Sequence, residues 1–188
     1  MDATDEPGWA TLSESVVYRG RLTLVDHAVR LPDGTQTSYE VDESIPFAVA
    51  TLVVDGDHVL LARQYRYPLR RWIYDLPGGA GHESEEPVEA ARRELEEELG
   101  IIADDLRPLH TFFINPGRTA WPVHLMIATA GVRVGQADLS DPSEQVRLVR
   151  VALTELDGLI ARGEIVDPAL IVARAVGAAS GVLPPLGA

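Results

Sequence analysis

Residues 78 to 101 read GGAGHESEEPVEAARRELEEELGI, and most of what the sequence predicts about fold and function depends on this stretch. Pro87 suits the first position of an α-helix and Gly100 suits the residue just past its end. The sequence therefore predicts a helix between them. Apolar residues recur at helical spacing within it and predict one buried stripe, formed by Val88, Ala91, Leu95 and Leu99.

Three glutamates, Glu94, Glu97 and Glu98, lie together on this helix, beside the apolar stripe. Like charges at such spacings cost about 0.2–0.5 kcal/mol per pair, and the C-terminal end of a helix disfavours anions. We expect no Lys or Arg on the same arc to compensate them. A solvated charged face is one interpretation. A site for a hard divalent cation accounts for all these features and is favoured, because Mg²⁺ and Mn²⁺ prefer carboxylate and carbonyl oxygens.

The stretch resembles the signature of the Nudix hydrolases: a glycine, five residues, a glutamate, seven residues, then Arg-Glu-aliphatic-x-Glu-Glu-x-Gly-aliphatic. Every spacing is kept, by Gly79, Glu85, Arg93, Glu94, Leu95, Glu97, Glu98, Gly100 and Ile101. The resemblance implies an α+β fold, a mixed α/β/α sandwich. It also implies hydrolysis of a nucleoside diphosphate linked to another moiety.

The resemblance implies roles for single residues as well. The implied metal ligands are the backbone carbonyl of Gly78 and the carboxylates of Glu94, Glu97 and Glu98, with Mg²⁺ or Mn²⁺ as the cofactor. Glu97 and Glu98 are also the implied catalytic residues. Glu85 and Arg93 are expected to be mainly structural, with Arg93 holding the loop to the helix. Metal ions suit this chemistry because they neutralise charge on a pyrophosphate and lower the pKa of an attacking water.

The preceding segment, ARQYRYPLRRWIYDLPGG, resembles that of ADP-ribose pyrophosphatases and related nucleoside-diphosphate-sugar hydrolases. Asp75 and Gly78 stand where glutamate and alanine are commoner in that group. By this resemblance Arg66 would lie near the substrate phosphates, with Arg63 as a second candidate. A local cation is needed, because the net charge of -13 would repel an anionic substrate. The alternative is that these arginines only pair with surface acids.

Downstream, Pro116 and the segment GEIVDPALIVA are further features of the ADP-ribose group. Where that group usually carries a glutamate four residues after a Pro-Gly pair, this chain has Trp121. Trp121 either stacks on a nucleobase or covers the core. Glu144, in the acidic segment DLSDPSEQ, is therefore our candidate general base, and a solvated turn is the alternative.

Composition limits the possible functions. The chain has 188 residues, 46% hydrophobic and 24% charged, which suits a globular protein with its own core. The net charge argues against nucleic acid or an anionic membrane as a partner. The absence of cysteine excludes disulfides, thiolate metal sites and a cysteine nucleophile. The acidic start, MDATDEPGW, does not resemble a signal peptide, and no apolar run is long enough to span a membrane, so we expect a cytoplasmic protein.

Two blocks are expected along the chain. Residues 1–44 contain three strand-like runs, SESVVYR, LTLVDHAVRL and QTSYEVDE, and predict an antiparallel β-meander. Residues 45–182 would form the Nudix hydrolase domain. A meander of this size is unstable alone, so it should pack on the core or on a partner subunit. In the ADP-ribose group it builds a homodimer, which the resemblance implies here.

Within the second block, PFAVATLVV and HVLLARQYR flank Asp55-Gly56-Asp57 and predict a hairpin. Three more runs, RPLHTFFI, VHLMIATAGV and EQVRLVRVA, favour strands, and LTELDGLIARG and PALIVARAVGAA favour two C-terminal helices.

The sequence thus predicts a divalent-metal-dependent enzyme that hydrolyses ADP-ribose, or a related nucleoside diphosphate sugar, to a nucleoside monophosphate and a sugar phosphate. Trp121 keeps open a different Nudix substrate, such as GDP-mannose, a dinucleotide or an oxidised nucleotide. A non-catalytic module that senses nucleotide sugars is disfavoured, because such a module would tend to lose the metal carboxylates.

Overall fold

The structure is a computed structural model that describes residues 7–137 and 145–187. Its strands are β1 (Ala10–Arg19), β2 (Thr23–Arg30), β3 (Gln36–Asp42), β4 (Ala48–Asp55), β5 (His58–Arg66), β6 (Arg71–Asp75), β7 (Ile101–Ile102), β8 (Arg107–Phe112), β9 (Val123–Ala128), β10 (Arg133–Val134) and β11 (Val146–Ala152). Its helices are α1 (Pro87–Leu99), α2 (Leu153–Ala161) and α3 (Pro168–Ala179), with a short 3-10 turn, η2 (Tyr67–Leu69).

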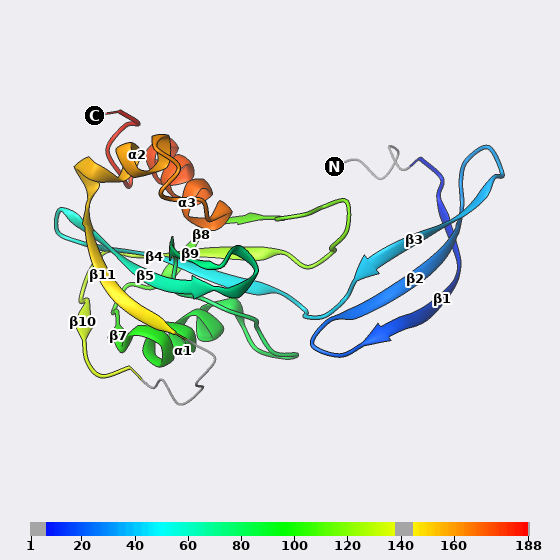
Figure 1. Cartoon of the computed structure of the whole chain (residues 1–188), viewed down its shortest axis with the longest axis horizontal. Helices are drawn as coiled ribbons and strands as arrows, with labels where there is room; N and C mark the ends of the chain where they lie inside the picture. The colour runs from blue at the N-terminus through cyan, green and yellow to red at the C-terminus, as the bar shows by residue number, and fades with distance from the viewer. Residues whose placement is uncertain (1–6, 138–144, 188) are drawn as a thin grey trace.

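A six-stranded mixed sheet forms the centre of the larger lobe (Figure 1). The strand order is β11-β5-β4-β9-β8, and β6 pairs with β5 off this path. β4 and β9 run parallel, whereas the other neighbours are antiparallel. Helix α1 lies on one face and helices α2 and α3 on the other. The predicted α+β class and α/β/α sandwich are confirmed.

The two faces of this sheet carry separate cores because successive side chains of a strand point to opposite sides. On β5, Leu60 belongs to the α1 core, which also includes Leu95 and Leu99 of α1. Its neighbour Leu61 belongs to the α2–α3 core, which includes Leu170. Both leucines on β5 are fully buried, and each such side chain contributes about 1.5–3 kcal/mol to folding. The continuous apolar run of β5 therefore fits a strand covered on both faces.

The N-terminal strands form a separate antiparallel sheet in the order β1-β2-β3, as predicted, and it stands beside the larger lobe (Figure 1). Its contacts with the lobe lie at the end of β3. There the Asp42 N–H donates to the Arg118 carbonyl at 2.8 Å, and the Tyr39 hydroxyl donates to the Gly117 carbonyl at 2.9 Å. Every residue of β1 is exposed.

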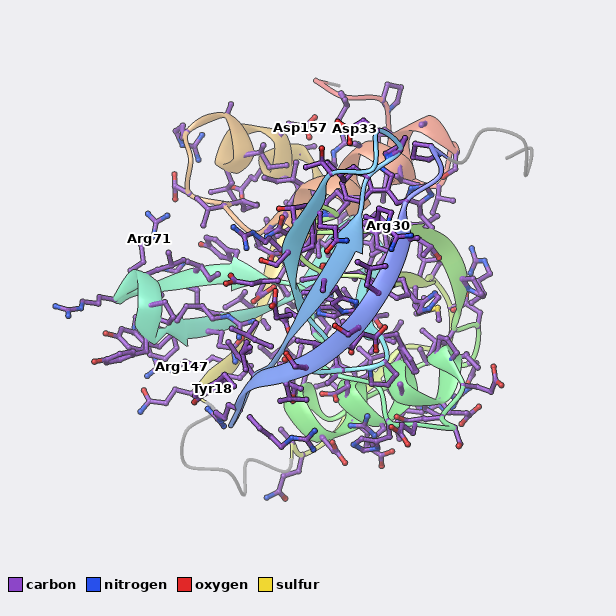
Figure 2. The ribbon with its side chains drawn as sticks, turned by 90° about the vertical axis from the view of Figure 1, so that its right-hand side faces the viewer. Tyr18, Arg30, Asp33, Arg71, Arg147 and Asp157 are labelled. Carbon is purple, nitrogen blue, oxygen red and sulfur yellow. The ribbon has the colours of Figure 1, made fainter. Side chains whose placement is uncertain are left out.

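This N-terminal sheet carries an unusual number of exposed large apolar side chains. Figure 2 faces the sheet and shows Tyr18 at the end of β1. The exposed apolar residues of this region are Trp9, Leu12, Val16, Val17, Tyr18, Leu22 and Tyr39. Such side chains are commonly covered by a partner in solution.

Three strands were not predicted. β6 continues the chain after η2 and completes a hairpin with β5, although the sequence suggested only an approach to the glycine loop. β7 and β10 are two-residue strands that pair with each other, Val134 opposite Ile101. Strands this short have no periodicity to read, because their pairing is set by tertiary contacts. None of the described helices has the length and hydropathy needed to cross a membrane.

Candidate active site

Helix α1 begins and ends where the sequence predicts. Gly100 follows it with φ of +63°, and the Gly100 N–H donates to the carbonyl of Glu96, which closes the helix end. The buried residues are Ala90, Ala91, Leu95, Glu98 and Leu99. The predicted stripe is confirmed for Ala91, Leu95 and Leu99. Glu98 extends it, and is thus a carboxylate carried on the buried side of the helix.

Residues 77–81 run alongside β4 and bring a glycine backbone against α1. Backbone N–H groups of β4 donate to the carbonyls of Pro77 and Gly79, each at 2.9 Å. Because backbone groups alternate along an extended chain, the N–H and carbonyl of Gly78 point away from β4. The Gly78 N–H donates to Glu98 Oε2 at 2.9 Å. The loop therefore presents Gly78 to the buried carboxylate of α1.

The two loop glycines are closely surrounded, Gly78 by backbone and Gly79 by a side chain. A Cβ on Gly78 would lie 2.1 Å from the Val49 carbonyl oxygen, so β4 leaves no room for it. A Cβ on Gly79 would lie 2.7–2.8 Å from the carboxylate of Glu94. The glycine pair thus allows two carboxylates of α1, those of Glu94 and Glu98, to reach the loop backbone.

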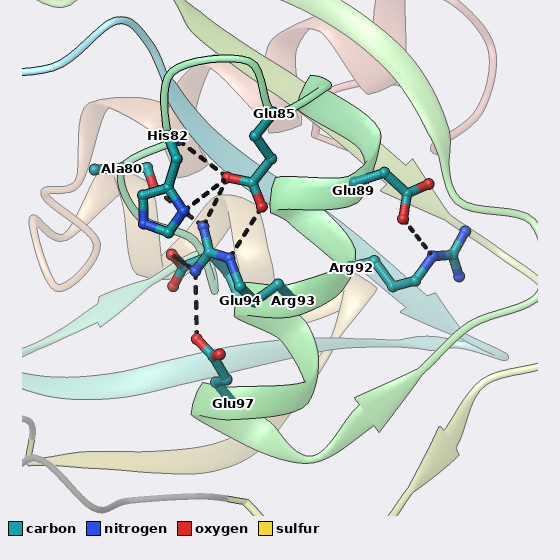
Figure 3. Close-up of polar contacts among 8 residues, drawn as sticks. All are labelled: Ala80, His82, Glu85, Glu89, Arg92, Arg93, Glu94 and Glu97. Carbon is teal, nitrogen blue, oxygen red and sulfur yellow. Dashed lines mark hydrogen bonds and ion pairs between the residues drawn. The ribbon is translucent and has the colours of Figure 1, made fainter.

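Arg93 joins the loop to the helix (Figure 3). Its Nε donates to Glu85 Oε1 at 3.0 Å and its Nη2 to Glu85 Oε2 at 3.1 Å, a paired arrangement that is among the stronger ion pairs in proteins. Nη2 also donates to the Ala80 carbonyl at 3.2 Å. The hydrogen bonds from Arg93 and from the His82 N–H lower the pKa of Glu85 to about 2, and the same pair raises the pKa of Arg93. The contact implied between Arg93 and the loop is present.

The prediction that no arginine compensates the glutamates is wrong. Arg93 Nη1 donates to Glu94 Oε1 at 2.7 Å and to Glu97 Oε2 at 3.3 Å (Figure 3). Arg93 directly precedes Glu94 and lies one helical turn before Glu97, a spacing that lets side chains meet. Charge repulsion along α1 is therefore partly relieved within the protein. A surface cavity of about 450 Å³ opens beside Arg93 and Glu97.

The carboxylates fit a divalent cation in donor type, since carboxylate and carbonyl oxygens are the ligands that Mg²⁺ prefers. Glu94 and Glu98 both lie against the glycine loop. The Glu97 side chain is 53% exposed and bonds Arg93. Within residues 7–137 and 145–187, no group of three acidic or histidine side chains is already arranged around one point.

The two arginines predicted to contact the substrate, Arg66 and Arg63, have different surroundings in the structure. Arg66 Nε donates to Asp75 Oδ2 at 3.1 Å, Nη2 bonds the same oxygen, and 45% of the Arg66 side chain is exposed. The Arg63 guanidinium lies 4.3 Å from the centroid of the Tyr74 ring. Tyr74 packs on the α2–α3 core, away from α1.

Trp121 is partly buried and packs on the α2–α3 core, as the core-covering interpretation expects. Its indole Nε1 is buried and finds no hydrogen-bond acceptor among the described residues. Glu144, the candidate general base, lies outside the described residues.

Two carboxyl groups, those of Asp75 and Asp167, were given no role from the sequence. Asp75 is 5% exposed and ends β6. Asp167 caps α3, accepting the Leu170 N–H at 2.7 Å. Burial and the charge of Asp75 raise the pKa of Asp167 to about 7. The Asp-Pro pair at the start of α3 is a recognisable cap signal, and the structure bears it out.

Comparison with known proteins gives consistent results. A family model described as the NUDIX domain matches residues 45–171. An ADP-ribose pyrophosphatase of Bacillus subtilis (strain 168) is 31% identical over 159 residues, which cover 84% of this chain and 85% of the relative. A methanol dehydrogenase activator of Bacillus methanolicus is 29% identical over 165 residues, covering 87% and 89%.

A solved structure, the crystal structure of an ADP compounds hydrolase, superposes with a TM-score of 0.75 at 24% identity. The match covers 92% of this chain and 96% of the other. At 24% identity this structural match supports the fold alone, including the N-terminal sheet. It compares the course of the chain, so it does not depend on the glutamate motif.

Proposed function

The chain belongs to the Nudix family, and from this premise we propose that it is a divalent-metal-dependent hydrolase of ADP-ribose or a related nucleoside diphosphate sugar. Water would add to one phosphorus of the diphosphate as the bridging P–O bond breaks, giving a nucleoside monophosphate and a sugar phosphate. The observation that carries the proposal is the contact of Glu94 and Glu98 with the Gly78–Gly79 backbone. The similarity to an ADP-ribose pyrophosphatase supports the substrate class.

The residues proposed to hold Mg²⁺ or Mn²⁺ are the Gly78 carbonyl, Glu94, Glu97 and Glu98. A bound divalent cation neutralises charge on a diphosphate and lowers the pKa of a coordinated water. The protein keeps the ligands together: the Gly78 N–H fixes Glu98, and the Arg93–Glu85 pair ties the loop to α1. These contacts orient the ligands before substrate arrives, which is what a second layer of contacts does at metal sites.

Arg66 is proposed to contact a substrate phosphate. It is partly exposed, and Asp75 fixes the edge formed by Nε and Nη2. Among the described residues Nη1 has no hydrogen-bond partner, so it could bind an anion. A planar guanidinium held in this way suits phosphate. Arg63 and Trp121 remain secondary candidates, because both pack toward the α2–α3 core.

Glu144 is proposed as the general base on the basis of its place in the chain. It directly precedes Gln145, whose carbonyl accepts the Tyr65 N–H at 3.2 Å, one residue before Arg66. A carboxylate at this point of the chain is close in sequence to the β11–β5 pairing that carries the proposed phosphate contact.

We also propose that two copies associate through the N-terminal sheet. A three-stranded sheet with β1 exposed along its length has too little core to be stable alone. Its exposed apolar side chains, including Val16 at 48% and Tyr18 at 55%, suit burial against a second copy.

The test is product analysis with a panel of substrates: ADP-ribose, ADP-glucose, GDP-mannose, NADH and deoxynucleoside triphosphates, each with Mg²⁺ or Mn²⁺. We expect AMP and ribose 5-phosphate from ADP-ribose to form fastest, and Glu97→Gln to abolish their formation. If another substrate is faster, the substrate class is wrong and the metal helix stands. If no substrate is cleaved, the sensing module becomes the better account.

A further inference from the structure

Two arginines lie flat on aromatic rings where β11, β5 and β6 pair. The Arg63 guanidinium lies 4.3 Å from the centroid of the Tyr74 ring, and the Arg147 guanidinium lies 4.7 Å from the centroid of a Trp72 ring. Arg147 on β11 is directly opposite Arg63 on β5, and Tyr74 on β6 is opposite Arg63 on its other side. We call Arg63, Arg147, Trp72 and Tyr74 the arginine–aromatic layer.

This layer lies on the opposite face of the sheet from the arginine proposed to contact the substrate. Successive side chains of a strand alternate between faces, and Leu61 of β5 belongs to the α2–α3 core. Arg63 therefore shares the α2–α3 face, where Tyr74 also packs. By the same alternation Arg66 lies on the face that α1 covers. The layer is thus separate from the proposed substrate contact.

The positive charge of the layer is not neutralised by the protein. Among residues 7–137 and 145–187, neither Arg63 nor Arg147 has a carboxylate within ion-pair distance or a hydrogen-bond acceptor. Arg150, on the same strand as Arg147, instead bonds Asp55 at 2.7 Å. The chain has 29 acidic and only 16 basic residues, so unpaired arginines are not expected from composition. Like charges directly opposite each other on neighbouring strands are destabilising, and a bound anion would remove this cost.

The geometry of the layer suits phosphate groups. Trp72 and Tyr74 are two residues apart on β6, so the guanidiniums over them are separated by about 7 Å along the strand. A guanidinium stacked through its face keeps its N–H edges available, and these edges match phosphate oxygens. Arg147 is exposed, on the left-hand side of the molecule in Figure 2. Tyr65 borders the layer, 37% exposed and 6.0 Å from Trp72 between ring centroids.

We propose that the arginine–aromatic layer is a second anion site, which binds a phosphate-bearing ligand through Arg63 and Arg147. The ligand is either an inorganic polyphosphate or a nucleotide, whose base would lie against Tyr65. The site goes beyond the proposed function and does not rest on it, because neither α1 nor a divalent cation takes part.

The test is calorimetric binding of inorganic pyrophosphate and of AMP to chelator-treated protein. Without divalent cations the carboxylates of α1 repel anions, so binding at the proposed metal site is suppressed. We expect the wild type to bind, and Arg147→Gln to bind on the order of tenfold more weakly, because one charge-assisted contact is lost. Tighter binding of AMP would identify a nucleotide as the ligand, and tighter binding of pyrophosphate an inorganic anion; either order supports the site.

Two further variants show where the anion binds. Arg150→Gln is the matched control on β11, since Asp55 already neutralises Arg150, and it should bind as the wild type does. Arg66→Gln, on the other face of the sheet, should also keep the binding. Loss of binding in Arg66→Gln but not in Arg147→Gln would overturn the proposal, because the anion would then occupy the proposed substrate site. No detectable binding to the wild type at millimolar ligand would overturn it too.

Arg147→Glu gives a second readout by thermal melting. A glutamate opposite Arg63 replaces a like-charge pair with an opposite-charge pair on an exposed position, so this variant should fold. Pyrophosphate should raise the melting temperature of the chelator-treated wild type, because a ligand that binds only the folded state stabilises it. The same pyrophosphate should leave the melting temperature of Arg147→Glu unchanged. An equal rise in both proteins would contradict a site built on Arg147.

Discussion

Among single residues, Arg93 sets the charge balance of the site. Its guanidinium contacts Glu85, Glu94 and Glu97, so one cation holds the loop and relieves the repulsion along α1. The planar fork of arginine makes this possible, and a lysine could not satisfy the same carboxylates at once. Arg93 therefore orders the carboxylates that we propose as metal ligands.

The Glu85–Arg93 pair predicts a pH-dependent contribution to stability. The pKa of Glu85 is lowered from the usual 4.5 to about 2, so its stabilisation is present above pH 4.5 and is lost as pH falls through about 2. Glu85→Gln should lower the melting temperature at pH 7, and the difference from wild type should shrink between pH 4.5 and 2. Thermal melts followed by circular dichroism across this range would measure it.

The control for that series is Glu83→Gln, which removes an exposed glutamate from the same loop. Its melting temperature should equal that of the wild type at every pH of the series. If the difference in melting temperature between Glu85→Gln and the wild type stays constant down to pH 2, the lowered pKa is not due to the ion pair.

At the level of secondary structure, local signals explain what was predicted. Pro87, the apolar stripe and Gly100 set both ends of α1, and Gly56 adopts φ of +63° in the predicted hairpin turn. Features that depend on distant parts of the chain were not predictable. The pairing of β7 with β10 is one example, and the hydrogen bond from the Tyr39 hydroxyl to the Gly117 carbonyl is another.

The site shows the same division. The motif predicts which glutamates hold the metal, and two of them, Glu94 and Glu98, lie against the glycine loop. Their role as metal ligands stays a prediction. The contacts of Arg93 with Glu94 and Glu97 were not predicted, because positions on a helical wheel do not show how far a long side chain reaches.

The glycine loop yields a paired prediction. Gly79→Ala places a methyl group against the end of the flexible Glu94 side chain, which can move aside, so the protein should fold and lose most of its activity. Gly78→Ala places a methyl group against the β4 backbone at Val49. Backbone in a sheet cannot move aside, so this variant should have a markedly lower melting temperature. Melting curves and turnover measured on both variants would separate the effects. Equal stability of the two variants would contradict the described packing.

In the molecule as a whole, the N-terminal sheet contacts the larger lobe at the end of β3 and leaves β1 exposed. The proposed dimer predicts that Val16→Glu, which puts a charge among the exposed apolar side chains, will shift the protein toward monomer. Ser15→Glu, one position earlier on the same strand, is the matched control and should not. Size-exclusion chromatography with light scattering would measure the masses. A wild type that is monomeric at micromolar concentration would rule out the dimer.

The measurement that tests the account most directly is the rate of AMP and ribose 5-phosphate formation from ADP-ribose as Mg²⁺ is titrated into chelator-treated protein. The wild type should be inactive without the metal and recover with it. Glu98→Gln, which removes the carboxylate held by the Gly78 N–H, should be slower by at least about 100-fold. Glu96→Gln, on the exposed side of α1, should match the wild type. Full activity in chelator, or full activity of Glu98→Gln, would contradict a metal-dependent site built on α1.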